Sequence, residues 1–291
     1  MPTHLPPPRI AAVHDLSCLG RCALTVIIPT LSVMGFQVVP LPTALLSTHT
    51  GGYTDLHFRD LTEDMSGITA HFSRLGTSFA SIYSGFLGSA EQIEVVSRLI
   101  DDFGSTPLPD GKKPLVLVDP VMGDEGALYS TYTDELVRGM RHLATKADLI
   151  TPNLTEACFL TEIPYRPTAE MAKDKLDAYL DRLMRRLEDF GTPRIVITGI
   201  PTRAGELANL GRNPDGSRFT VSNPLQAPSY PGTGDIFASV LLGSLLAKND
   251  FEAACRKAAD FISELIRDSS RIDTPVREGV ALEPHLHLLC K

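Results

Sequence analysis

Short apolar runs alternate with longer segments that carry one apolar face along the whole chain. Ile93, Val96 and Ile100 recur at the spacing of one helix face, which predicts an amphipathic helix around them. The run PLVLVDP at 114–120 is instead apolar up to its last two residues, which is typical of a parallel strand covered on both faces. The pattern therefore predicts strands and helices in turn.

The same patterns locate the other elements. Predicted strands cover residues 9–14, 37–46, 79–84, 114–120, 147–151 and 194–198. Predicted helices cover residues 22–35, 60–75, 90–103, 134–144, 154–160, 169–190, 230–247 and 251–268. Pro29 predicts a kink in the first helix or a later start, and the prolines of the strand at 37–46 predict an edge position. NPDG at 213–216 predicts a hairpin within residues 206–222.

This order of elements has no internal repeat and no low-complexity linker. It predicts one α/β domain over residues 1–291, with a mostly parallel central sheet and helices on both faces. The proline-rich residues 1–8 are expected to form a flexible start. In such sheets ligands bind at the carboxyl ends of the strands, so the loops after strands are the ones to inspect.

Composition narrows the class of protein. The chain of 291 residues is 43% hydrophobic and 21% charged, which is ordinary for a soluble globular protein. Its formal net charge is −8, and Lys and Arg are not clustered, so nucleic acid and anionic membrane are poor partners. No apolar run approaches the roughly 20 residues that span a bilayer. The start MPTHLPPPRI lacks the order of a signal peptide, which predicts a cytoplasmic location.

The cysteines are too dispersed along the chain for a disulfide framework. They are Cys18, Cys22, Cys158, Cys255 and Cys290, with no CxxC pair. An odd number at these spacings favours reduced thiols over disulfides or a zinc site. Cys18 and Cys22 have the spacing of one helix face, and His285 and His287 are expected at the surface rather than as metal ligands.

Small, polar and acidic residues recur in the loops after the predicted strands. These loops are HDLS at 14–17, STHTGGY at 47–53, SGFLG at 84–88, DPVMGD at 119–124, TPNLTE at 151–156, TG at 198–199 and GTGD at 232–235. Each has an alternative explanation as a turn or a helix cap. Their recurrence at one edge of the sheet favours a common site.

The stretch PGTGD at 231–235 directly precedes an apolar helix. A glycine-rich helix start presents unpaired backbone N–H groups and the positive end of the helix dipole, so it suits an anion. Asp235 is then either a helix cap or a functional acid beside that anion. The chain has no GxxxxGK[ST] loop and no dinucleotide fingerprint, so a phosphate ligand would be bound by a different motif. It also has no GxSxG nucleophile elbow.

These loops resemble those of the ribokinase superfamily, most closely pyridoxal kinases of the bacterial pyridoxamine-kinase type in its vitamin-kinase branch. The matching residues are HDLS (14–17), STHTGGY (47–53), SGFLGS (84–89), VDPVMGD (118–124), TPNLTEA (151–157), VITG (196–199) and PGTGDIFAS (231–239). GTGD alone also occurs in sugar kinases, whereas its combination with VDPVMGD and TPNLTEA is a strong indication of the vitamin branch. The resemblance implies a three-layer α/β/α ribokinase-like fold.

The resemblance also implies a reaction, the transfer of the γ-phosphate of ATP to the 5′-hydroxymethyl group of pyridoxal, pyridoxamine or pyridoxine in pyridoxal 5′-phosphate salvage. Asp235 matches the family residue that accepts the proton of the attacking hydroxyl. The N–H groups of Gly232, Thr233 and Gly234 match the anion hole that holds the transferring phosphoryl group. A base beside an anion site is sensible for phosphoryl transfer, which depends on positioning and electrostatic stabilisation.

The nucleotide side follows from the same resemblance. Asn153 and Glu156 match residues that organise metal and phosphate in similar kinases. Thr198 and Gly199 match residues that face the phosphates of ATP. The segment 201–229 is expected to form a loop or hairpin near the ATP site, where it could close over the nucleotide as a lid.

A magnesium ion is expected with ATP. Asp119, Asp124 and Glu156 are the acids near the phosphates that could hold Mg²⁺ directly or through water. Asp124 is equally consistent with a turn acid. Many relatives also need a monovalent cation such as K⁺, which the sequence neither requires nor excludes.

Asp15, Ser17, His49, Thr50 and Phe86 are the candidates for binding the vitamin ring. A hydroxypyridine needs a few placed polar partners and a flat apolar wall. Phe86 could supply that wall, and an ordinary core position explains it nearly as well.

The vitamin-side loops depart from the family pattern. The second loop has an extra glycine relative to an SNHTGY-like loop, and either His14 or Asp15 could stand where relatives have serine. The choice of vitamer therefore stays open.

Three alternatives share parts of this pattern. A hydroxymethylpyrimidine or hydroxymethylpyrimidine-phosphate kinase of thiamine synthesis has the same fold and base, but His49 and Thr50 favour the pyridoxal branch. A sugar kinase is disfavoured because the chain lacks a large N-terminal lid insertion. A non-catalytic binder of pyridoxal phosphate or nucleotide would have no need of Asp235. The resemblance also implies a homodimer, for which the edge strand near Val38–Pro42 is a reasonable contact.

Overall fold

The computed structural model describes residues 6–106, 108, 111–272 and 275–290. The strands are β1 (Arg9–Leu19), β2 (Gln37–Thr48), β3 (Phe58–Asp60), β4 (Ser81–Ser84), β5 (Leu115–Val118), β6 (Gly123–Asp124), β7 (Ala127–Leu128), β8 (Leu149–Ile150), β9 (Arg194–Pro201), β10 (Glu206–Arg212) and β11 (Arg218–Pro224). The α-helices are α1 (Leu24–Val33), α2 (Thr62–Arg74), α3 (Ala90–Phe103), α4 (Asp134–Ala144), α5 (Leu154–Thr161), α6 (Lys173–Glu188), α7 (Thr233–Leu246) and α8 (Phe251–Ser269). Two 3₁₀ helices, η1 (Val276–Glu278) and η2 (Glu283–Leu289), follow.

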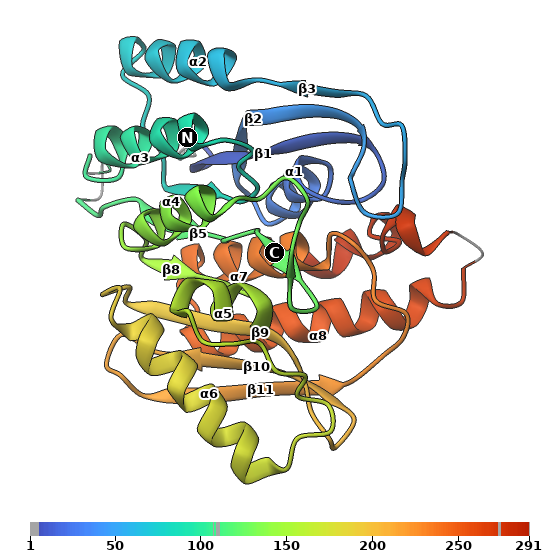
Figure 1. Cartoon of the computed structure of the whole chain (residues 1–291). Coiled ribbons are helices and arrows are strands. Elements are labelled where there is room, and N and C mark those ends of the chain that lie inside the picture. The colour runs from blue at the N-terminus through green and yellow to red at the C-terminus, as the bar shows by residue number, and fades with distance from the viewer. Residues whose placement is uncertain (1–5, 107, 109–110, 273–274, 291) are drawn as a thin grey trace, which may run out of the picture.

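A nine-stranded sheet runs through the molecule in the order β11-β10-β9-β8-β5-β4-β1-β2-β3 (Figure 1). The strands from β9 to β2 are mutually parallel, so their carboxyl ends meet at one edge. Antiparallel pairs extend the sheet at both ends, through the β10–β11 hairpin and the short β3. The hairpin around NPDG is confirmed by these pairings.

Helices cover both faces of the sheet (Figure 1). One core joins α2 to α6 with the sheet, and Leu99 and Leu183 are fully covered within it. The second core joins α1, α7 and α8 with the opposite face, and Ile236 and Leu241 are fully covered there. The chain therefore has the ribokinase-like α/β fold with three layers, as predicted.

The proline positions behave largely as their chemistry predicts. Helix α1 begins at Leu24, later than expected, and keeps Pro29 inside it. Strand β3 pairs only with Ala44–Leu46 of β2. Pro40 and Pro42 lie in the part of β2 that has no partner strand on this edge, so their missing N–H groups cost no ladder bond there.

Two predictions near the ends of the chain are wrong, and a third falls largely outside the described residues. Cys18 lies in β1, because this strand continues to Leu19, so the predicted helix face shared with Cys22 is wrong. His285 is buried rather than at the surface, because its ring is held between the carboxylate of Asp268 and the carbonyl of Ala281. The expectation of a flexible start falls largely on residues 1–5, outside the described residues.

Within the described part of the chain, no helix has the length and apolarity needed to cross a membrane.

Candidate active site

The start of α7 lies at the edge where the parallel strands end. Its N-cap is Gly232, with φ 77° and ψ −4°, in the left-handed region that favours glycine. A Cβ atom at this position would overlap the carbonyl oxygen of Arg21. No described side chain caps this helix start, so the N–H groups of Thr233 and Gly234 remain for an anion.

Asp235 lies in the first turn of α7, beside this anion turn. Its Oδ2 accepts a hydrogen bond of 2.8 Å from the backbone N–H of Ala23. Burial raises the pKa of the Asp235 carboxyl to about 7, and the negative charge of Asp15 adds to the rise. A carboxyl with a pKa near neutrality is suited to accept and release a proton.

A second buried carboxyl, Asp119, follows β5. Its Oδ1 accepts a bond of 2.9 Å from the hydroxyl of Thr151. Burial and the nearby charge of Asp235 raise the pKa of Asp119 to about 7. The two acids are therefore close enough to interact, as the parallel strand ends predict.

We expect activity to rise with pH through about 7, because a base must be ionised to accept the hydroxyl proton and the pKa of Asp235 lies near that value. Below this pH both Asp235 and Asp119 take up protons, and kcat/KM should fall about tenfold per pH unit. A pH profile of kcat/KM at saturating ATP measures this fall, which is the acid limb of the profile. A flat profile down to about pH 5 would contradict the assignment of a buried base.

Asn153 and Glu156 form a capping box at the start of α5. The Asn153 side chain accepts from the N–H of Glu156, and the Glu156 carboxylate accepts from the N–H of Asn153, at 2.9 and 2.8 Å. Glu156 Oε1 also accepts from the N–H of Met122 at 3.1 Å, and Asn153 Nδ2 donates to the carbonyl of Gly123 at 2.9 Å. The pair thus ties α5 to the 119–124 loop. Burial, followed by the charge of Asp119, raises the pKa of Glu156.

Replacing Asn153 with Ala should lower the free energy of unfolding by about 1 kcal/mol, the usual cost of a lost N-cap. It should also lower kcat, because the loop that carries Asp119 loses its bond from Asn153. Asp250→Ala is the matched control, since Asp250 caps α8 with a bond of 2.9 Å to the N–H of Ala253. Thermal unfolding and turnover are measured for both. A loss of turnover in Asp250→Ala as large as in Asn153→Ala would contradict a local role for Asn153.

The predicted metal ligands are only partly brought together. Asp119 and Glu156 are buried and interact. Asp124 is exposed in the small β6–β7 hairpin, and its Oδ1 accepts from the N–H of Glu125 at 2.8 Å, as a turn acid does. Among the described residues, no three His, Cys, Asp or Glu side chains are grouped so that they could hold a metal ion. An ion here would need further oxygen ligands from phosphate or water.

Thr198 and Gly199 lie near the end of β9, next to the capping box. The N–H of Thr198 donates to the carbonyl of Pro152 at 2.8 Å, and Thr198 forms a parallel bridge with Asn153. Gly199 is exposed with φ 63°, and no atom would obstruct a Cβ there. The fold therefore brings the four predicted nucleotide residues to one edge.

Asp15 and Ser17 lie in β1, where its pairing with β2 is irregular between His14 and Leu16, and the charge of Asp15 acts on Asp235. The Ser17 hydroxyl donates to Asp15 Oδ2 at 2.8 Å. Burial raises the pKa of Asp15. His14 is buried between Tyr83 and Gly85, and its Nε2 has no partner among the described residues. Burial lowers the pKa of His14 to about 3.

Both ring nitrogens of His49 are engaged. The N–H of Gly51 donates to Nδ1 at 3.1 Å, so Nδ1 is an acceptor, and Nε2 lies 2.6 Å from the carbonyl of Arg277. The guanidinium of Arg277 lies 4.8 Å from the ring centre of Tyr53, which itself packs edge-on against His49. His49 therefore orients the 47–53 loop, and Thr50 is exposed on it.

Phe86 is half-buried, with its ring edge-on to Tyr132 at 6.3 Å. This position is consistent with an apolar wall and with a core residue alike. No sequence motif marks Ala23, Arg21 or Arg277, because their contacts are made by backbone atoms or by segments far apart in the chain.

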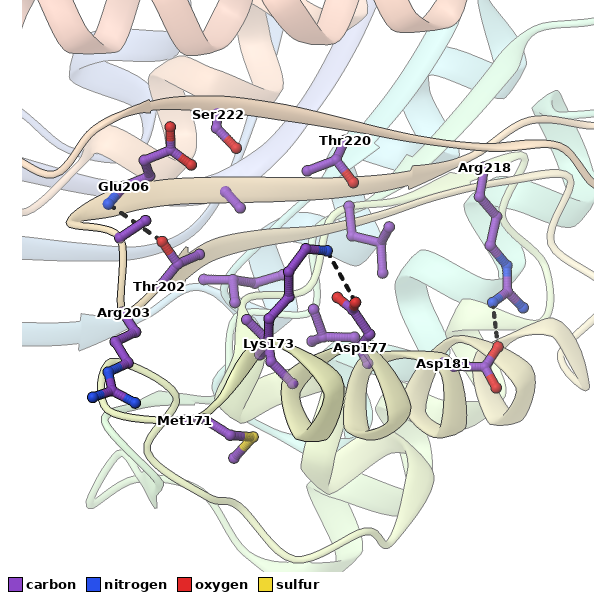
Figure 2. A pocket seen from close by; sticks show the side chains of 16 residues that line it. Met171, Lys173, Asp177, Asp181, Thr202, Arg203, Glu206, Arg218, Thr220 and Ser222 are labelled. Atoms are coloured by element: carbon purple, nitrogen blue, oxygen red, sulfur yellow. Dashed lines mark hydrogen bonds and ion pairs between the residues drawn. The ribbon is translucent and has the colours of Figure 1, made fainter.

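A separate cavity of about 490 Å³ opens between α6 and the β9–β11 strands (Figure 2). Leu176, Leu180 and Ile200 belong to its apolar lining, and Arg203 lies near the β9–β10 turn. The cavity is on the face of the sheet opposite α7, and none of the predicted site residues lines it. The candidate site at the strand edge is therefore not this cavity.

Comparison with known proteins agrees with this fold. The phosphomethylpyrimidine kinase family matches residues 12–278. A crystal structure of a candidate phosphomethylpyrimidine kinase from Bacteroides thetaiotaomicron, solved with pyridoxal, is 44% identical with a TM-score of 0.88, and the match covers 97% of this chain and 95% of that one.

Two curated relatives point to the two substrate classes of the branch. A pyridoxal kinase of Pasteurella multocida is 31% identical over 77% of this chain and 76% of its own length. A hydroxymethylpyrimidine/phosphomethylpyrimidine kinase of Haemophilus influenzae is 26% identical over 85% of this chain and 86% of its own length.

Proposed function

Because the chain belongs to the phosphomethylpyrimidine kinase family and is an ATP-dependent vitamin kinase, we propose that its acceptor is vitamin B6. The reaction would transfer the γ-phosphate of ATP to the 5′-hydroxymethyl group of pyridoxal, pyridoxamine or pyridoxine. The product from pyridoxal is pyridoxal 5′-phosphate, so the enzyme would act in its salvage.

One observation carries the proposed phosphoryl transfer, the position of Asp235 beside an uncapped, glycine-rich helix start. Its Oδ2 is held by the Ala23 amide, so Oδ1 is the oxygen that would accept the proton of the substrate hydroxyl. That hydroxyl oxygen would then attack the γ-phosphorus, and ADP would leave. The N–H groups of Gly232, Thr233 and Gly234 would hold the charge of the transferring group.

Magnesium would accompany ATP in this scheme. The donor set fits such an ion, because Asp119 and Glu156 are buried acids whose pKa values are raised by burial and by neighbouring carboxylates. When bound, Mg²⁺ would neutralise phosphate charge. Asp119 and Glu156 would hold it directly or through water, and Asp124 would contribute from the loop edge. Asn153, Thr198 and Gly199 would orient the phosphates, and K⁺ is a candidate second cation.

Pyridoxal is favoured over the thiamine pyrimidine by the second loop. His49 orients this loop, and Thr50 and the pair Asp15–Ser17 would supply polar partners for the ring, with Phe86 as a wall. The Bacteroides relative was solved with pyridoxal. The family match and the Haemophilus relative keep hydroxymethylpyrimidine as the second candidate substrate.

ATP consumption by the purified protein with Mg²⁺ and K⁺ tests the proposal. Pyridoxal, pyridoxamine, pyridoxine and hydroxymethylpyrimidine are supplied separately. We expect turnover with the pyridoxal group. Turnover with the pyrimidine alone would assign the protein to thiamine synthesis instead.

We also propose that the protein is cytoplasmic and that it forms a homodimer. Residues Val38–Pro42 of β2, which do not pair with β3, are a suitable contact between the two copies. Light scattering at micromolar concentration distinguishes a dimer from a monomer.

A further inference from the structure

The peptide bond between Arg21 and Cys22 is enclosed by two glycines from distant parts of the chain. Gly232 begins α7, and Gly279 follows η1, with φ values of 77° and 82°. A Cβ atom on Gly232 would overlap the Arg21 carbonyl oxygen, and one on Gly279 would lie 2.8 Å from the same oxygen. Both contacts are too close for a side chain, so the three segments are in direct backbone contact.

The C-terminal segment holds this peptide by hydrogen bonds as well. The N–H of Arg21 donates to the carbonyl of Glu278 at 2.9 Å. The Arg21 guanidinium Nε lies 2.9 Å from each carboxylate oxygen of Glu283. Glu283 begins η2, and η2 is in turn fixed to α8 by the bond of 2.9 Å between His285 and Asp268.

The residue that this arrangement positions is Ala23. It has φ 49° and ψ −135°, a conformation that residues other than glycine rarely adopt, so surrounding contacts must hold it. In this conformation its N–H points at Oδ2 of Asp235, at 2.8 Å. A chain of contacts thus runs from Glu283 and Glu278 through Arg21 to Ala23 and Asp235.

We propose that the C-terminal segment 276–283 is a positioning element of the active site, which holds Asp235 in place through Arg21 and the Ala23 amide. Most of this segment lies beyond residue 278, where the family match ends. The inference rests on the proposed role of Asp235 as the base. Arg21 and Glu283 act through Ala23 and are positioning residues.

A pH readout separates this role from a merely structural one. The N–H of Ala23 lowers the pKa of Asp235, against burial and the charge of Asp15, which raise it. Asp119 is the other acid that interacts with Asp235, and Cys22 and the hydroxyl of Tyr83 also lie near it. A looser Ala23 amide leaves those groups unchanged. It should therefore raise the pKa of Asp235 and move the acid limb of the profile to higher pH.

Glu283→Gln and Arg21→Lys test the inference with the full chain. We expect kcat to fall about fivefold in each, an effect the size of one partly exposed ion pair. The acid limb should move to higher pH, and KM for ATP should stay within about twofold. The charge-swapped double variant, Arg21→Glu with Glu283→Arg, should recover part of the loss. The control is Glu252→Gln, which removes the exposed pair between Glu252 and Arg256 on α8 and should change neither kcat nor the profile.

The failures are distinguishable. In one outcome the wild type turns over, and kcat and the pH profile of Glu283→Gln and Arg21→Lys match those of the control Glu252→Gln. This would overturn the positioning role and leave the proposed function intact. A reduced kcat with an unmoved acid limb and no recovery in the swapped variant would overturn it too. A wild-type protein without turnover on any of the four acceptors would overturn the proposed function, and this inference with it.

Discussion

Asp235→Asn should lower kcat by about 10²–10⁴-fold, the contribution of a well-placed general base. The amide keeps the shape of the carboxylate, and its oxygen can still accept the N–H of Ala23, so the site should keep its geometry. Nucleotide affinity should therefore be unchanged, because the phosphate-binding N–H groups are untouched. Steady-state turnover with pyridoxal and calorimetric binding of an ATP analogue measure the two quantities.

The same variant should be more stable than the wild type above neutral pH. The pKa of Asp235 is raised from 3.8 to about 7, so the folded state binds its proton more tightly than the unfolded chain. Ionising Asp235 thus costs stability progressively as pH rises from about 4 to 7, and the full cost remains above that range. Asparagine removes this cost, so its melting temperature should exceed that of wild type at about pH 8 and approach it near pH 4. For the turnover prediction above, a kcat of Asp235→Asn equal to that of the wild type would contradict the assignment of Asp235 as the base.

Gly232→Ala should abolish most turnover, by about 10²–10³-fold, comparable with the loss of an anion-hole donor. Two causes act together. The left-handed φ of 77° is strained for alanine, and the new Cβ would overlap the Arg21 carbonyl. The turn must shift, and the N–H groups of Thr233 and Gly234 would leave the positions that bind the phosphoryl group.

Gly191→Ala is the matched control for this substitution. Gly191 has almost the same φ, 76°, but no atom lies within 4 Å of a Cβ placed there. It should show only the stability cost of a strained φ, about 1 kcal/mol, with kcat unchanged. Turnover of Gly232→Ala close to that of Gly191→Ala would show that the close approach to Arg21 is unimportant for catalysis.

Much of the fold could be predicted from the sequence, because local periodicity decides it. The helix at 90–103 was predicted with the bounds that α3 has, since its apolar stripe and the N-cap Ser89 agree. Strand β1 was predicted too short. The residues after His14 mix polar and apolar side chains, from the buried Ser17 to the exposed Leu19, and show no strand pattern of their own. Only their pairing with β2 continues the strand to Leu19.

The candidate site was predictable as a set of loops but not in its internal contacts. Parallel strand ends must meet, so Asp119, Asn153 and Asp235 were expected near one another. The capping box of Asn153 and Glu156 follows from their spacing, in addition to the metal and phosphate role that the family resemblance implies for both residues. The contacts of Ala23 had no signal, because a backbone N–H is the same in every residue but proline.

The C-terminal segment shows the same limit. Arg277, Glu278 and Glu283 contact loops more than 200 positions away in the chain. No periodicity or motif links such distant residues, so their role emerges only from the fold. His285 was expected at the surface for the same reason, since its partner Asp268 belongs to another helix.

The central claim is that this chain forms a phosphate ester on the 5′-hydroxymethyl group of vitamin B6, with Asp235 as the base. Phosphorus NMR of a reaction of wild-type protein with MgATP and pyridoxal tests it most directly. We predict a new phosphomonoester resonance coupled to methylene protons, appearing with ADP and absent with Asp235→Asn. Inorganic phosphate and ADP without that ester, or an equally strong ester signal with Asp235→Asn, would contradict the account.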